Sequence, residues 1–189
     1  MIDDLGTHPF WEFSLRLYGL PGIAPACLHM QDRLGIDVNL VLFFVWWGAT
    51  GRNDLEAQDF ETIVARATRW QEDVVRPVRN ARRAAKAGAP QLSDDEARRV
   101  YREVLSTELL LERAEQLIIA RTADRLDRTS GCASPGQTIR NLLGRYFFRV
   151  GVAARPEDWH AATTVIDGAL ALPAYGEPSL SKKRCASVS

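Results

Sequence analysis

The sequence predicts an all-α fold, a single-domain helical bundle of about seven helices that includes a long charged helical hairpin. Three observations predict it. Apolar residues recur three and four positions apart, which is the spacing of one face of a helix. Turn signals rich in glycine and proline separate these segments. No stretch shows the alternating pattern of a strand. A length of 189 residues suits one domain, which we place at residues 1–172, followed by a disordered C-terminal tail at 173–189.

Two helices are predicted in the N-terminal part of the chain. The first covers residues 8–18, where apolar side chains fall on one face, and Thr7 is its candidate cap. The turn signal Gly-Leu-Pro-Gly follows at residues 19–22. A second helix then covers residues 23–34 and ends at Gly35.

The third predicted helix is the most informative part of the sequence. It begins after the capping residue Asp37, ends near Gly48, and is apolar on nearly all sides. A helix of this kind is buried by its neighbours. Its apolar run is roughly a dozen residues, short of the ~20 that span a bilayer, so we expect the centre of a soluble core.

A fourth helix is predicted to begin at Asp54 or Asp59 and to reach about Lys86. Pro77 lies inside this helical pattern. Proline lacks the amide donor and clashes with the preceding turn, so we expect a kink or break near Val74.

The fifth helix begins at a capping box formed by Ser93 and Glu96, and it is predicted to cover residues 94–125. Together with the fourth helix it makes the charged hairpin. Its predicted inward row is apolar: Val100, Val104, Leu105, Leu109, Leu111, Leu117, Ile118 and Leu126. A sixth helix opens at Ser134 and Pro135, and a seventh at Pro156.

Composition bounds the class of protein. The chain has 24 basic and 24 acidic residues, so no global charge favours nucleic acid or an anionic membrane. Its three cysteines form no CxxC pair, and such a sparse, odd set is typical of reduced thiols. The acidic N-terminus lacks the features of a signal peptide. We therefore expect a cytoplasmic protein without a membrane span.

The first fifty residues carry a family resemblance. They contain Phe10-Trp11 followed by Ser14-Leu15 and Tyr18, and later the run Asp37-Val38-Asn39-Leu40. These elements resemble the FWxxSLxxY and DVNLxLF signatures of a family of small uncharacterised bacterial all-helical proteins, a domain of unknown function. The resemblance weakens after the region of Arg76 and Pro77. It implies a helical bacterial protein and no particular activity.

Aromatic and amide side chains in the N-terminal half are the first candidate site. Trp46 and Trp47 point about 100° apart on the third helix, so both are buried only if that helix is central. Otherwise Trp46, Trp47, Trp11 and Asn39 form a ligand-binding or partner-binding surface. The structural alternative is that the rings belong to the core and that the Asn39 amide bonds to a neighbouring loop.

Arginines of the fourth helix are the second candidate site. Arg76, Arg79 and Arg83 fall near one helical face and could bind an anion. The alternative is compensation by the fifth helix, whose facing residues are acidic: Glu103, Glu108, Glu112 and Glu115. Zero net charge favours compensation, and aromatic residues are not interleaved with these arginines, which disfavours nucleic acid.

The sequence offers no candidate for catalysis or metal binding. A single Glu-x-x-His occurs at residues 157–160, where a di-metal bundle needs two. Cys27 and His29 are two residues apart and so face different sides of a helix. No nucleophile elbow, phosphate-binding loop or dinucleotide fingerprint is present. We expect no metal and no cofactor, and the catalytic residues of any enzyme activity stay unknown.

These observations leave three hypotheses of function. The leading one is a non-enzymatic protein-interaction module whose partner is another protein or a second copy of the chain as a homodimer. The second is a small-molecule-binding protein or enzyme with an aromatic pocket near Trp46 and Trp47. The third is anionic-ligand or nucleic-acid binding through Arg76, Arg79 and Arg83.

Overall fold

The computed structural model describes residues 5–6, 8–126, 134–151 and 153–172. In these ranges, segments with apolar residues at helical spacing form helices that pack together. Within these ranges the chain forms helices and no β-strand, which confirms the all-α class. The elements are α1 (Pro9–Tyr18), α2 (Ile23–Leu34), α3 (Val38–Ala49), α4 (Ala57–Trp70), the π-helical segment η2 (Gln71–Val75), α5 (Arg76–Ala87), α6 (Asp94–Ala123), α7 (Pro135–Arg149) and α8 (Pro156–Ala171). Since α4, η2 and α5 follow one another without a loop, they constitute the predicted fourth helix.

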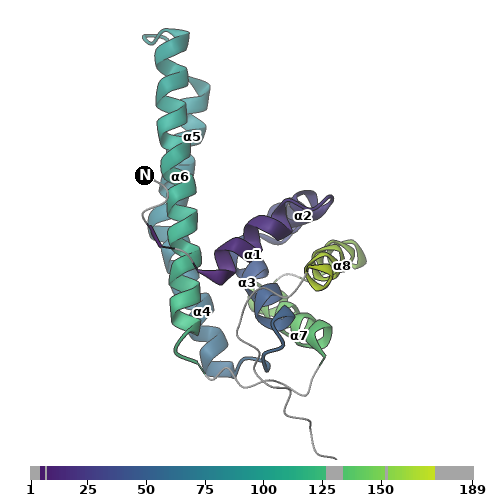
Figure 1. Ribbon diagram of the computed structural model, residues 1–189. Coiled ribbons are helices and arrows are strands. Elements are labelled where there is room, and N and C mark those ends of the chain that lie inside the picture. Colours follow the sequence, from purple (N-terminus) through teal and green to yellow (C-terminus); the bar gives the residue numbers. More distant parts are fainter. Residues whose placement is uncertain (1–4, 7, 127–133, 152, 173–189) are drawn as a thin grey trace, which may run out of the picture.

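Two regions of different character are visible in Figure 1. The helices α1, α2, α3, α7 and α8 gather beside the lower part of α6. The upper part of α6 stands with α5 as a hairpin that extends away from this cluster. We call α5 together with residues 94–107 of α6 the arm. No residue of the arm is buried.

The helix α3 lies at the centre of the cluster. Every residue from Leu40 to Gly48 is buried, and α3 packs against α1, α2, α6, α7 and α8. The centroid of the Phe43 ring lies within 6 Å of the ring centroids of Phe10, Phe44, Trp46 and Trp47. A helix that is apolar on all sides has to be enclosed in this way, so the prediction of a buried third helix is confirmed.

Gly48 allows α3 and α7 to approach closely. A methyl group on its Cα would lie 2.5 Å from Cγ1 of Ile139, a distance that forces one of the two helices to move. Glycine at this position therefore sets the spacing of the two helices rather than ending α3, which continues through Ala49.

Polar residues at helix starts behave largely as the sequence predicts. Asp37 Oδ1 accepts from the amide of Asn39 at 2.8 Å, and Ser93 forms its capping box with Glu96. The cap of the first helix differs from the prediction. His8 holds that position, and its Nδ1 accepts from the amide of Phe10 at 3.1 Å. Thr7 and the predicted tail lie outside the described residues.

The predicted distortion near Val74 takes the form of η2. The amide of Arg76 donates to the carbonyl of Gln71, five residues earlier, as in a π-helix. Pro77 follows directly and has no amide to offer, so the wider turn lets the helix continue through it. The Trp70 indole donates to the Leu111 carbonyl at 3.0 Å and fixes this segment to α6.

Two residues of the predicted inward row of the fifth helix are exposed, and that part of the prediction is wrong. Val100 lies in the arm, beyond the reach of the core. Leu109 lies nearer the core but lines an open groove. The helix bounds also shift slightly, because α4 starts at Ala57 and α6 ends at Ala123. Among the described residues, no helix is both long and apolar enough to cross a membrane.

Candidate functional site

An open groove of about 1060 Å³ lies between the arm and the helical cluster. One side is formed by α1, α2 and the start of α3, and the other by η2, α5 and the middle of α6, while α4 and α7 also contribute lining residues. Its residues therefore come from segments that are far apart in the sequence. The groove joins an apolar wall, a row of arginines and a polar floor.

The apolar wall consists of side chains that face water in the structure. Leu15 and Tyr18 of α1, Leu28 of α2 and Leu109 of α6 are 37–55% exposed, and all four line the groove. Trp11 is half-buried at the same wall. Exposed apolar side chains that gather in one concave place mark a binding surface more often than scattered ones do.

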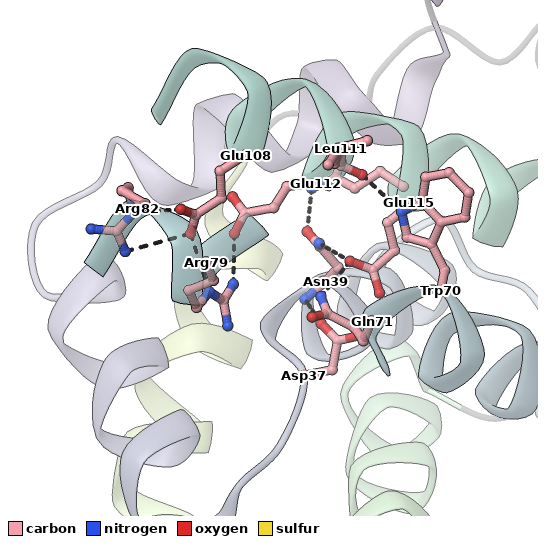
Figure 2. Close-up of polar contacts among 11 residues, drawn as sticks. Asp37, Asn39, Trp70, Gln71, Arg79, Arg82, Glu108, Leu111, Glu112 and Glu115 are labelled. Carbon is pink, nitrogen blue, oxygen red and sulfur yellow. Dashed lines mark hydrogen bonds and ion pairs between the residues drawn. The ribbon is translucent and has the colours of Figure 1, made fainter. Parts of the chain in front are cut away.

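Two arginines in the groove are paired within the hairpin. Arg79 Nε lies 3.1 Å from Glu108 Oε1, and its Nη2 lies 2.7 Å from Glu112 Oε1. Arg82 also donates to the Glu108 carboxylate (Figure 2). Glu108 is buried between them. These contacts hold α5 against α6 and compensate the charges involved.

Two other arginines in the groove have no such partner. Arg76 and Arg83 are exposed and line the groove. Neither forms an ion pair with any residue that the structure describes. The three predicted anion-binding residues are thus divided, because Arg79 is engaged within the hairpin while Arg76 and Arg83 face the groove.

A hydrogen-bonded network of amides and carboxyl groups forms the floor. The Asn39 amide donates to Glu115 Oε2 at 2.8 Å and accepts from Gln116 Nε2 at 2.8 Å. Gln71 Nε2 also donates to Glu115 Oε2, at 2.5 Å (Figure 2). The network ties α3, η2 and α6 together, so Asn39 bonds to a neighbouring helix rather than to a loop.

Asp37 and Glu115 form a carboxyl pair within this floor. Burial raises the pKa of Glu115 to about 10, and the neighbouring Asp37 contributes to this rise. Burial also raises the pKa of Asp37. Two carboxyl groups that share a buried site cannot both ionise cheaply, so the pair holds a proton at neutral pH. Arg79, Glu112 and Tyr146 are the other titratable groups that act on it.

Trp46 and Trp47, two of the predicted ligand-binding or partner-binding residues, lie outside the groove. Trp46 and Trp47 are only 3% and 2% exposed, and neither lines the groove. The Arg52 guanidinium covers them at 4.3 and 4.9 Å from the ring centroids. The Trp47 indole donates to the Asn53 carbonyl at 2.7 Å. Of the four predicted ligand-binding or partner-binding residues, the structure brings only Trp11 and Asn39 to the groove.

A second charged cluster, which the sequence reasoning missed, joins α2 to α8. Asp158 is fully buried, accepts from Arg33, and lies 3.0 Å from His29 Nε2. Hydrogen bonds from Arg33 hold the pKa of Asp158 well below its usual range. The cluster fastens two helices and lies outside the groove. No three His, Cys, Asp or Glu side chains gather as metal ligands in the described part of the chain.

Comparison with known protein families identifies the family of this chain. The model of a family described as protein of unknown function (DUF2390) matches residues 9–119, more than half of the chain. The matched segment contains α1 to α5 and most of α6, and so most of the groove lining, apart from Tyr146, Arg149 and Val150. No curated protein and no solved structure matches the chain.

Proposed function

The chain belongs to the DUF2390 family, and we propose that it is a protein-interaction module whose groove binds an amphipathic helix of a partner protein. Since the family description assigns no activity, the proposal is drawn from the geometry of the groove.

The observation that carries this proposal is the apolar wall. Leu15, Tyr18, Leu28 and Leu109 come from three helices and stay exposed beside one groove, although the chain has a well-filled core elsewhere. A folded chain gains about 25 cal/mol for each Å² of apolar surface removed from water. A partner that covers these side chains would gain that free energy, which the isolated chain does not.

The dimensions of the groove favour a helix as the occupant. A helix with its side chains is about 10 Å across, and a helix that binds in a groove places apolar residues at positions i, i+3, i+4 and i+7. The groove is open to solvent, holds about 1060 Å³, and takes its exposed apolar side chains from α1, α2 and α6. A partner helix can therefore enter from solvent and contact α1, α2 and α6 together.

Labelled peptides test the proposal. Three amphipathic peptides of about 18 residues share one apolar face and carry glutamate, lysine or glutamine on the other. Fluorescence anisotropy should show binding of at least one peptide to the full chain. Leu28→Asp combined with Leu109→Asp should weaken that binding at least about tenfold.

A matched control uses an apolar residue away from the groove. Phe148 on α7 is 88% exposed and does not line the groove, so Phe148→Asp should leave peptide binding unchanged. The proposal is wrong if no peptide binds, or if the double leucine variant binds as well as the unmodified chain.

Sedimentation velocity distinguishes a partner protein from a second copy. Under the proposal, the chain stays monomeric at concentrations where the peptide binds. If it self-associates, and if the Leu28 and Leu109 substitutions abolish that association, the groove is a homodimer interface and the proposal of a separate partner is overturned.

A further inference from the structure

We propose that the partner helix is acidic on the side that faces α5, and that Arg76 and Arg83 bind two of its carboxylates. This inference rests on the proposed function, because it names the chemistry of the helix that the groove binds.

The spacing of the two arginines matches a helical partner. Arg76 and Arg83 are seven residues apart on α5, which places them on one face and about 10.5 Å apart along the axis. Two carboxylates seven residues apart on a partner helix that runs alongside α5 have the same separation. A guanidinium binds a carboxylate through two parallel hydrogen bonds, which fixes its orientation as well as its distance.

The ion pairs around the groove involve the other arginines and leave Arg76 and Arg83 unpaired among the described residues. Arg79 and Arg82 are paired with glutamates of α6. Arg149 also lines the groove, and its Nε lies 3.0 Å from Glu61 Oε2. Only Arg76 and Arg83 therefore remain as groove arginines without an ion pair among the described residues.

Acidic residues in the groove define the orientation of the partner. Asp32 on α2 and Glu72 on η2 also line it, and neither forms an ion pair with a described residue. Asp32 would repel carboxylates at α2, so the acidic side of the partner should face α5. Glu72 lies on the same side as the arginines, four residues before Arg76, and reduces the positive charge at that end. The carboxyl pair of Asp37 and Glu115 adds less repulsion than two carboxylates, because its members hold a proton between them.

A charge-reversal experiment tests the inference on the full chain. The glutamate peptide should bind more tightly than the lysine and glutamine peptides. Arg76→Glu combined with Arg83→Glu should lower the affinity for the glutamate peptide at least about tenfold and raise the affinity for the lysine peptide. Arg76→Lys with Arg83→Lys should weaken binding of the glutamate peptide less than the charge reversal does, since the charge remains while the fork is lost.

The arm supplies a matched control with the same change of charge. Arg99 and Arg102 on α6 are exposed, form no ion pair with a described residue, and do not line the groove. Reversal of both should change the affinity for the glutamate peptide less than about twofold at roughly 0.15 M salt, where distant charges are screened. Equal losses in the two double variants would show a general field effect and overturn the inference.

Other outcomes separate this inference from the proposed function. If the lysine or glutamine peptide binds best, and still depends on Leu28 and Leu109, the interaction module stands and the acidic partner is wrong. If a single-stranded RNA oligomer binds and loses affinity on reversal of Arg76 and Arg83, these arginines serve nucleic acid, and the inference is overturned. Circular dichroism of each variant confirms that the fold is retained.

Discussion

The helices α3 and α5 have the same length of 12 residues and opposite surroundings. Nine consecutive residues of α3 are buried, whereas α5 has none. The helix α3 depends on five neighbouring helices, while α5 packs chiefly on η2 and α6. Burial of apolar surface supplies most of the stability of a fold, so the cluster around α3 holds the molecule together. The arm adds little to that core and presents charged side chains to the groove.

The arm stays attached through polar contacts. At its base, α5 forms ion pairs with Glu108 and Glu112 of α6. The Ser93 capping box begins α6 at the tip, and the Trp70 indole on Leu111 fixes the segment just before α5 to α6. Contacts of this kind contribute less than a packed core, and regions built on them open locally before the whole protein unfolds. The difference predicts that substitutions in the cluster change global stability, whereas substitutions in the arm change local opening.

The largest effect is expected in the cluster. Phe43→Ala removes a ring that is fully buried in α3, and such a truncation lowers the free energy of unfolding by about 3–5 kcal/mol. Phe148→Ala removes a ring of the same kind from an exposed position and should change the free energy of unfolding by less than about 0.5 kcal/mol. Urea unfolding followed by circular dichroism measures both. Similar losses for the two variants would contradict the assignment of stability to α3.

The next effect concerns pH. The pKa of Glu115 is raised to about 10 in the folded state, against about 4.3 in an unfolded chain. The contribution of Glu115 to the free energy of unfolding is fully present below pH ~4. It is lost as pH rises toward 10, because the unfolded state releases a proton that the folded state keeps. Between about pH 5 and 9, the free energy of unfolding of Glu115→Gln should therefore rise relative to the unmodified chain, by up to about 1.4 kcal/mol for each pH unit.

Urea unfolding at about pH 5, 7 and 9 measures how the free energy of unfolding of each protein changes with pH. Glu103→Gln, at an exposed position of the same helix, should leave that pH dependence unchanged. The range avoids acid conditions, where Asp158 acts in the opposite direction, since its lowered pKa stabilises the fold above about pH 4 and that contribution is lost as pH falls. Parallel slopes for the Glu115→Gln variant and the unmodified chain would show that the carboxyl pair does not hold its proton.

A smaller and local effect is expected from the ion pairs of the arm. Glu108→Gln removes the carboxylate that Arg79 and Arg82 share and should lower the free energy of local opening by about 1–2 kcal/mol. Amide exchange of α5 should accelerate while that of α3 stays unchanged. Glu61→Gln breaks an exposed pair outside the arm and should affect neither. Acceleration in α3 would mean that the arm and the core unfold together.

The smallest effect is expected at the tip. Ser93→Ala removes the side-chain cap of α6 and should cost about 1 kcal/mol of local helix stability. Exchange should accelerate only in the first turns of α6, after residue 93. Exchange that also accelerates near residues 108–116 would show that the tip is coupled to the groove.

Features set by short stretches of sequence were predictable. The buried third helix, the capping box and the distortion ahead of Pro77 depend on residues close together in the chain, and all three are confirmed. The exposure of Leu109 was not predictable, because a helical pattern shows which face is apolar but not whether another helix covers it. The partition between Arg76 and Arg79 likewise depends on which arginine meets the glutamates of α6.

The polar floor of the groove could not be predicted from the sequence, for a similar reason. Asp37 and Glu115 are far apart in the chain and meet only through tertiary packing. Within the sequence each has an ordinary local explanation, one as a helix cap and the other as a charged helix residue. Only the position of Asn39, in the first turn of an apolar helix, indicated that a buried amide needed partners there.

Hydrogen exchange of the full chain, with and without the glutamate peptide, tests the central claim most directly. The claim is that a partner binds between the arm and the cluster while α3 acts only as support. Binding should slow exchange in α1, α2, α5 and residues 105–116 of α6, and should leave residues 43–48 of α3, which are buried and do not line the groove, unchanged. Protection confined to α7 and α8, or no protection at saturating peptide, would contradict the account.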